Sequence, residues 1–282
     1  MSKRLLTFAG SAVLVEYEGA QPEKIIEFLY GNVAGDGDIA PHLTFRLVEN
    51  ADGHLRLTQD DDLLYEGDSM AAAADLLLGK SCYHLADRSQ GGLLFHAGGL
   101  GRQGKGLLLP GTMGAGKTTL TVWLLSRGLD YLTDELVFVP QGLDTIQPFP
   151  RPLNLKQPAR PLFQHQLDFK NPDNQILSAD TTDLIPPTLF NPNTALSEPP
   201  LRLIIFPNYQ AESEFELRQL SKAQAGLELM QCLINARNLP DHGFPEVTRL
   251  ARSVPAYKIT YSSFAQLEPH IDPLLAAIRR AV

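Results

Sequence analysis

Hydrophobic and polar residues alternate along several short stretches of the first 90 residues, a pattern typical of half-buried β-strands. The stretches that predict strands are 11–19, 42–59 and 62–67. The second of these contains Asn50-Ala51-Asp52-Gly53, a sequence that favours a tight turn and so predicts a β-hairpin. Apolar residues three and four apart predict helices over 23–32 and 69–88, and Ser69 is a candidate N-cap of the second helix.

From residue 91 onward the pattern changes to buried apolar runs that alternate with amphipathic segments. Runs that predict strands cover 91–100, 104–110, 130–142, 201–207, 215–221 and 256–262; segments that predict helices cover 118–128, 222–236, 244–254 and 263–282. Residues 140–200 are rich in Pro, Asn and Asp, so we expect irregular structure with short strands and loops over a site. The sequence predicts an α/β protein with a mixed α/β region over 1–90 and a larger domain over 91–282.

Composition narrows the class of protein. The chain has 282 residues, a formal net charge of -8 and 44% hydrophobic residues. Because nucleic-acid phosphates select basic surfaces, the acidic charge argues against a nucleic-acid partner. The seven histidines and two cysteines show no metal-ligand spacing, so we expect no built-in zinc site.

The same composition bears on the compartment. The basic start and apolar run of residues 1–15 superficially suggest a secretion signal, but Thr7, Gly10 and Ser11 interrupt the run. No stretch reaches the ~20 apolar residues of a membrane span. The isolated Cys82 and Cys232 fit buried thiols in a reducing compartment, and we expect a cytoplasmic protein.

Residues 111–118, Gly-Thr-Met-Gly-Ala-Gly-Lys-Thr, match the phosphate-binding pattern G-x-x-x-x-G-K-[ST]. Glycines let the backbone curl so that successive N–H groups point at an anion, and the helix that follows directs its positive end at the same place. Lys117 would reach the β- and γ-phosphates of ATP, and the Thr118 hydroxyl would bind Mg²⁺. An apolar strand before the loop and a helix after it, with Gly128 at the C′ position, give the motif its proper context.

Two acids, Asp134 and Glu135, follow Lys117 by only 17 and 18 residues. If the strand over 130–142 ran parallel to the loop's strand, its start would lie away from the phosphates. An antiparallel or rearranged strand would bring Asp134 to the γ-phosphate, as a base for an incoming hydroxyl or as a Mg²⁺ ligand. A solvated acid pair at a strand end remains the alternative.

The spacing of loop and acids resembles the HPr kinase/phosphorylase family, whose P-loop core is like that of phosphoenolpyruvate carboxykinase. Gly128-Leu-Asp-Tyr-Leu-Thr-Asp-Glu135 is similar to the family segment that ends in two acids, although the second acid is Asp in that family. His96 lies 15 residues before Gly111, the offset of a family histidine that borders the active site. A histidine beside an apolar strand can equally be a core residue. The family has a later glycine-rich signature that is tied to its phosphorolysis activity, and this sequence has no counterpart of it. The resemblance therefore does not extend to the reverse reaction, phosphorolysis, or to HPr as the substrate.

The resemblance implies a set of site residues. The expected nucleotide-binding residues are Gly111, Thr112, Met113, Gly114, Ala115, Gly116, Lys117, Thr118 and Thr119; the expected catalytic residues are Asp134, Lys117 and His96; the expected metal ligands are Thr118 and Glu135. Arg151, Lys156 and Arg202 could neutralise phosphate charge or be ordinary surface cations. Trp123 fits a core position on the helix after the loop better than an adenine platform.

The sequence therefore predicts an HPr-kinase-related phosphotransferase that uses ATP and Mg²⁺. The expected acceptor is a hydroxyl, either a serine on a small protein partner or a group on a small metabolite. A nucleotide-binding regulatory module without transfer activity is the alternative from a different class. The family forms rings, so a homo-oligomer is an expectation by resemblance only.

Overall fold

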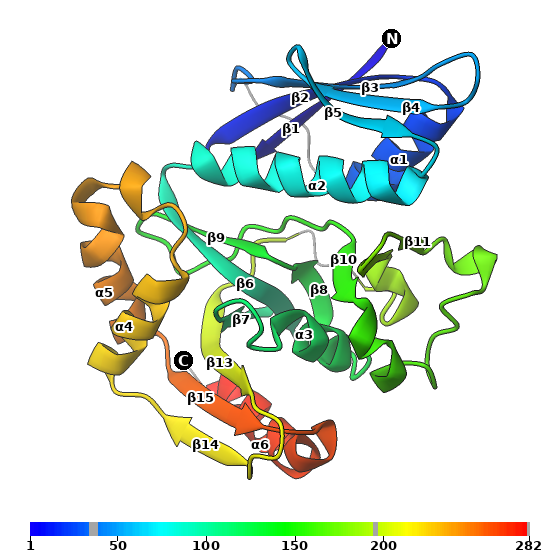
Figure 1. The fold of residues 1–282 in the computed structure, drawn as a ribbon. Helices are drawn as coiled ribbons and strands as arrows, with labels where there is room; N and C mark the ends of the chain where they lie inside the picture. The colour runs from blue at the N-terminus through cyan, green and yellow to red at the C-terminus, as the bar shows by residue number, and fades with distance from the viewer. Residues whose placement is uncertain (34–38, 194–196, 281–282) are drawn as a thin grey trace. The chain divides into compact units, whose positions relative to one another are not determined.

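The computed structural model describes residues 1–33, 39–193 and 197–280 as a mixed α/β protein with several sheets (Figure 1). The chain divides into two compact units. The first unit is Met1–Gln90 with Phe149–Leu189, and the second is Gly91–Pro148 with Phe190–Val282. The chain therefore returns to the first unit over Phe149–Leu189 before it completes the second. The predicted division into 1–90 and 91–282 does not include this return. That division into independent domains stays a prediction.

The first unit contains a five-stranded sheet in the order β1-β2-β3-β4-β5. Its elements are β1 (Ser2–Phe8), β2 (Ser11–Glu18), α1 (Ala20–Tyr30), β3 (Thr44–Glu49), β4 (Leu55–Gln59), β5 (Asp62–Gly67) and α2 (Met70–Asp87). The apolar run at the start of the chain is β1, which pairs antiparallel with β2.

Two local predictions in this unit are confirmed. β3 and β4 form an antiparallel hairpin, and Gly53 at its turn has a φ of 82°, which glycine adopts without a steric penalty. The Asn50 side chain accepts hydrogen bonds from the Asp52 and His54 N–H groups and so closes the turn. The Ser69 hydroxyl accepts from the Ala72 N–H at 3.2 Å and caps α2.

The proline-rich segment forms short strands, as predicted, and also short 3₁₀-helices, which the sequence did not predict. β10 (Leu153–Lys156), β12 (Thr182–Ile185) and β11 (Leu177–Ser178) pair in that order as a small sheet. The buried Asp183 carboxylate accepts two hydrogen bonds from the Arg160 guanidinium, and this bidentate pair satisfies a charge that burial would otherwise leave costly.

The second unit is built on a seven-stranded sheet in the order β14-β15-β13-β7-β6-β8, with β9 also pairing with β6. Its strands are β6 (Gly92–Arg102), β7 (Lys105–Pro110), β8 (Asp130–Thr133), β9 (Leu136–Pro140), β13 (Leu201–Tyr209), β14 (Glu216–Gln219) and β15 (Ala256–Tyr261). β7, β13 and β15 run parallel, so their carboxyl ends lie at one edge. β6 runs antiparallel to β7.

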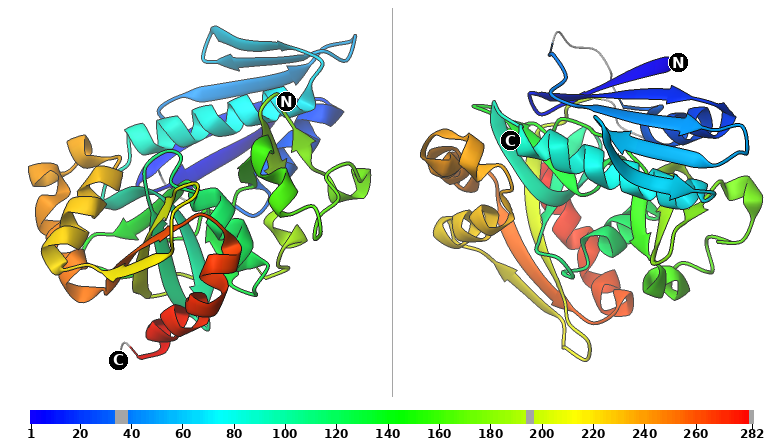
Figure 2. Two further views of the ribbon diagram at one scale, coloured as in Figure 1. Left: turned by 60° about the horizontal axis from the view of Figure 1, so that its bottom comes forward. Right: turned by 45° about the horizontal axis from the view of Figure 1, so that its top comes forward.

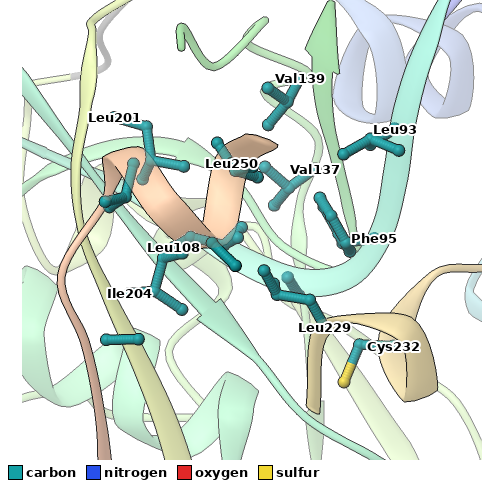
Figure 3. Packing of buried hydrophobic residues seen from close by; sticks show 14 of the residues in the cluster. Leu93, Phe95, Leu108, Val137, Val139, Leu201, Ile204, Leu229, Cys232 and Leu250 are labelled. Carbon is teal, nitrogen blue, oxygen red and sulfur yellow. The ribbon is translucent and has the colours of Figure 1, made fainter. Parts of the chain in front are cut away.

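Helices cover both faces of this sheet (Figure 2). They are α3 (Lys117–Leu125), α4 (Lys222–Cys232), α5 (Phe244–Ser253) and α6 (Phe264–Arg280). Apolar side chains from β6, β7, β9 and β13 pack against Leu229 of α4 and Leu250 of α5 to form a buried cluster (Figure 3). Each fully buried leucine contributes about 1.5–3 kcal/mol, so this cluster gives the strands that carry the loop a rigid base.

Candidate functional site

The segment between β7 and α3 curls tightly because its glycines adopt backbone angles that other residues avoid. Gly114 and Gly116 have φ angles of 84° and 89°. Gly116 is also the N-cap residue of α3, so the loop leads directly into the positive end of a helix. Alternating right- and left-handed backbone turns of this kind point successive N–H groups at one place.

The end of α3 is defined by short-range hydrogen bonds. The Gly128 N–H donates to the Leu125 carbonyl, and the Leu129 N–H donates to the Leu124 carbonyl. This pair of bonds, with Gly128 at a φ of 82°, is a Schellman motif, and it confirms Gly128 as the C′ residue. Trp123 is buried and stacks on Phe264 at 4.9 Å, which is a core position as expected.

Lys117 is folded back into the loop. Its side chain is only 7% exposed, and its Nζ donates to the Thr112 carbonyl at 3.0 Å. A phosphate placed in the loop would compete with this carbonyl for the ammonium group, because an anion is the stronger acceptor. In contrast, the Met113 side chain is 83% exposed, so only its backbone is available to line the loop.

The strand predicted over 130–142 is wrong in one respect: it is interrupted where the acids lie. β8 ends at Thr133 and β9 begins at Leu136, and both pair antiparallel with β6 along one edge. At the break, Glu135 has a φ of 79°, and its carbonyl accepts from the Ala97 N–H. Thr133 of β8 keeps the register of β9 on β6, and the register shifts further along, between Gly99 and Leu100.

Asp134 reaches the start of α3 as a result. Its Oδ2 accepts a hydrogen bond from the Thr118 hydroxyl at 3.0 Å. Asp134 is 1% exposed, so this is an interior contact and differs from the solvated acid pair that was the alternative. The structure therefore brings Asp134 and Thr118 together beside the loop.

Glu135 and His96 have looser connections to the loop. Glu135 is exposed, and its position follows from its backbone bond to β6. His96 is half-buried, and its carbonyl accepts from the Gly111 N–H at 3.4 Å, so it is level with the first loop residue. Residues two apart on a strand point to the same face of the sheet, so His96 lies on the same face of β6 as Gly98. Gly98 faces Thr121 of α3, so this is the face that α3 covers.

The three additional cations have different surroundings. Arg151 and Lys156 belong to the first compact unit, where Arg151 is buried and Lys156 is exposed. Arg202 is in the second unit, but next to Leu201, which pairs with Gly106 at the beginning of β7. The loop follows the other end of β7, so Arg202 lies at the opposite end of this strand.

Two tyrosines beside the loop were missed by the sequence reasoning. The Tyr209 N–H, at the end of β13, donates to the Ala115 carbonyl at 3.2 Å. A Cβ on Gly116 would lie 3.0 Å from the Tyr261 hydroxyl and 3.2 Å from the Tyr209 Cβ. Burial raises the pKa of Tyr261 well above its usual range. A signal was available in hindsight: Tyr261 lies near the end of the predicted strand 256–262 and Tyr209 lies two residues after the predicted strand 201–207, and ends of parallel strands meet at one edge.

The oxygen atoms at this site suit Mg²⁺ better than a softer metal. The Thr118 hydroxyl and the Asp134 carboxylate are hard oxygen donors within hydrogen-bond distance of one another. Over the described ranges, no group of three or more His, Cys, Asp or Glu residues could hold a metal. A site with few protein ligands fits Mg²⁺, which keeps several waters and binds substrate phosphates.

Comparisons with known proteins give little information about the family of this chain. No protein-family model matches the sequence, and no curated protein matches it. Among solved structures, the chain is similar to the Hpr(Ser) kinase/phosphatase from Coxiella burnetii, with a TM-score of 0.33 and 15% identity over 66% of this chain and 95% of that one. At this level of similarity, the roles proposed below rest on this chain's own residues. Within the described residues, no helix is both long and apolar enough to cross a membrane.

Proposed function

We propose that this protein is an ATP- and Mg²⁺-dependent kinase that transfers the γ-phosphoryl group to a hydroxyl. The observation that carries the proposal is the 3.0 Å hydrogen bond between Thr118, in the first turn of α3, and the buried Asp134. This contact places the Asp134 carboxylate next to the first turn of α3, where a loop of this kind would hold the terminal phosphates of a nucleotide. A carboxylate at this position could accept the proton of an incoming hydroxyl or bind Mg²⁺.

Binding in this proposal comes from backbone and one lysine. The N–H groups of the 111–118 loop and the positive end of α3 bind the phosphate oxygens. Lys117 leaves the Thr112 carbonyl and donates to the β- and γ-phosphates, where it offsets charge that develops during transfer. Thr119 follows in α3 and adds a hydroxyl near the phosphates.

The chemical step needs positioning and a proton acceptor. When bound, Mg²⁺ supplies Lewis-acid stabilisation of the phosphate oxygens, with Thr118 as a ligand and Glu135 as a second candidate ligand. Asp134 orients the acceptor hydroxyl and accepts its proton. The acceptor oxygen then forms a bond to phosphorus as the bond to the leaving ADP oxygen breaks. His96 borders the phosphates from the β6 side.

The class of acceptor has weaker support than the reaction. The resemblance of the loop and acid motifs to HPr-kinase-like proteins favours a serine on a small protein partner. A hydroxyl on a small metabolite uses the same chemistry, and the experiment below separates the two.

The test uses full-length protein, Mg²⁺ and γ-³²P-labelled ATP with a host lysate divided into protein and small-molecule fractions. The wild type should label one fraction, and Asp134→Asn should reduce labelling by at least about 100-fold while ATP still binds. Asp241→Asn, at an exposed position in the same unit, is the matched control and should label like the wild type. ATP binding without transfer to either fraction would reject the kinase and favour the regulatory module.

A further inference from the structure

A polar hollow of about 290 Å³ lies in the second unit, at the carboxyl ends of β13 and β15 and beside β14. The six side chains that line it are Asn208, Gln210, Glu216, Arg218, Lys258 and Thr260. None of them was singled out as a site residue by the sequence, and the phosphate loop does not include them. Its volume is enough for part of a small-molecule ligand, and its lining is polar throughout.

The floor of the hollow is held in place by two hydrogen bonds. The Asn208 side chain donates to the Thr260 hydroxyl at 3.1 Å, and Lys258 pairs with Glu228 of α4 at 2.7 Å. In contrast, Gln210 and Arg218 are exposed at the rim, with freedom to meet a ligand.

Three residues that line the hollow are sequence neighbours of tyrosines that contact the phosphate loop. Asn208 and Gln210 flank Tyr209, whose N–H donates to the Ala115 carbonyl of the loop. On the neighbouring strand, Thr260 precedes Tyr261, whose hydroxyl lies against Gly116. Because neighbouring residues of a strand face opposite sides of the sheet, the hollow opens on the other face from the side chains of Tyr209 and Tyr261. The Tyr209 N–H bond nevertheless places the loop one residue away from Asn208 and Gln210 along the chain.

The strand order places the hollow and the acids on opposite sides of the loop. β7, which leads into the loop, lies between β13 and β6, and the break that carries Asp134 follows β8 on the far side of β6. From β8 to β15 there are four strand spacings of about 4.8 Å, or about 19 Å. An acceptor hydroxyl in the hollow would lie too far from Asp134 to give up its proton there.

The side chains also suit a nucleoside. Asparagine and glutamine amides can donate to and accept from the edge of a base, as they do with adenine. A glutamate such as Glu216 can accept from ribose hydroxyls. The guanidinium of Arg218 can stack on the face of a base. Sites for nucleotides in α/β proteins lie at the carboxyl ends of parallel strands, and the lining of this hollow reaches that end of β13 and β15 at Asn208 and Thr260.

We propose that the hollow binds the base and ribose of the nucleotide whose phosphates the loop binds. The proposal rests on the proposed function, because it takes the 111–118 loop as a triphosphate site. It adds the residues that would distinguish a nucleoside triphosphate from bare polyphosphate, and it assigns Gln210 and Arg218 to that discrimination.

Calorimetry on the full chain with Mg²⁺ tests this, using ATP and inorganic tripolyphosphate as the two ligands. The wild type should bind ATP more tightly than tripolyphosphate. The double variant Gln210→Ala/Arg218→Ala should weaken ATP by about tenfold, on the scale of losing one hydrogen bond to a charged group, and leave tripolyphosphate within about twofold. Arg252→Ala, exposed on α5, is the matched control and should change neither.

The outcomes separate the two proposals. Unchanged ATP affinity in the double variant, or equal weakening of both ligands, would overturn the nucleoside site while leaving the loop's role intact. Failure of the wild type to bind either ligand would reject the proposed function itself, and the nucleoside site with it. Because both substituted side chains are exposed, unfolding is not expected, and circular dichroism of the variant checks this.

Discussion

The Thr118 hydroxyl donates a hydrogen bond to Asp134 Oδ2 at 3.0 Å, although 16 residues separate the two in sequence. The contact exists because β8 and β9 are two halves of an interrupted strand that runs antiparallel to β6. An acid so soon after a phosphate loop can therefore face the first turn of α3. The same contact makes a direct test of the proposed magnesium site possible.

Thr118→Val keeps the shape of the threonine but removes the hydroxyl. We expect transfer activity to fall by about 100-fold, the scale of losing one group that stabilises the transition state, and the Mg²⁺ dependence of ATP binding to weaken. Thr118→Ser keeps the hydroxyl and should retain most of the activity. Steady-state rates measured across a Mg²⁺ titration check this. Equal loss in the Val and Ser variants would mean that the methyl group is needed as much as the hydroxyl, and would contradict a specific role for the hydroxyl.

Gly116→Ala should destabilise the protein more than Gly53→Ala does. Both glycines have positive φ angles, so each substitution carries a backbone cost of about 1–2 kcal/mol. A Cβ at Gly53 meets open space, whereas at Gly116 it meets Tyr261 and Tyr209, which adds about 1–3 kcal/mol for overpacking. Urea unfolding of the two variants measures the difference. Equal free energies of unfolding would show that the loop relaxes around the new methyl group.

Gly98→Ala tests how closely α3 packs on β6. A Cβ at Gly98 would lie 2.4 Å from the Thr121 hydroxyl oxygen, so we expect a loss of about 2–3 kcal/mol in the free energy of unfolding. Thr121→Ala removes that oxygen, and the double variant should recover about 1 kcal/mol or more of the loss. A strictly additive double-mutant cycle would mean that the clash is relieved elsewhere.

Glu16 should make stability depend on pH. Hydrogen bonds from Lys3 and then Arg46 lower the pKa of the Glu16 carboxyl below its ordinary value of about 4.5. A carboxyl whose pKa is lower in the folded state stabilises the fold above the unfolded pKa, and the contribution is lost as pH falls through the folded pKa. Glu16→Gln should therefore flatten the fall in stability below about pH 4.5. Glu66 is exposed on β5, so Glu66→Gln is the control and should leave the dependence of stability on pH unchanged.

The Cys232 thiol should resist alkylation in the folded protein. The side chain is buried, and burial raises its pKa to about 11, so little thiolate is present at pH 8. Iodoacetamide at that pH should modify it only after unfolding in urea, with peptide mass spectrometry as the readout. Rapid modification in native buffer would show that α4 opens locally.

Sequence reasoning was sufficient for features that depend on neighbouring residues. The hairpin at Asn50–Gly53, the cap at Ser69 and the end of α3 at Gly128 each rest on side-chain and backbone bonds over a few positions. The same holds for the turns of the phosphate loop, since glycine at 114 and 116 can adopt left-handed angles at no steric cost. Such features are encoded locally, so a pattern of residue types predicts them.

Only the tertiary structure decided how distant segments meet. The sequence predicted a continuous strand over 130–142, and nothing in its alternation marked a break at Asp134 and Glu135. β13 lies between β7 and β15 although about 90 residues separate it from β7, and this insertion creates the polar hollow beside the loop. Likewise, residues 149–189 group with the N-terminal segment. Strand order and register are set by which faces bury most apolar surface, a property of the whole chain that local patterns do not contain.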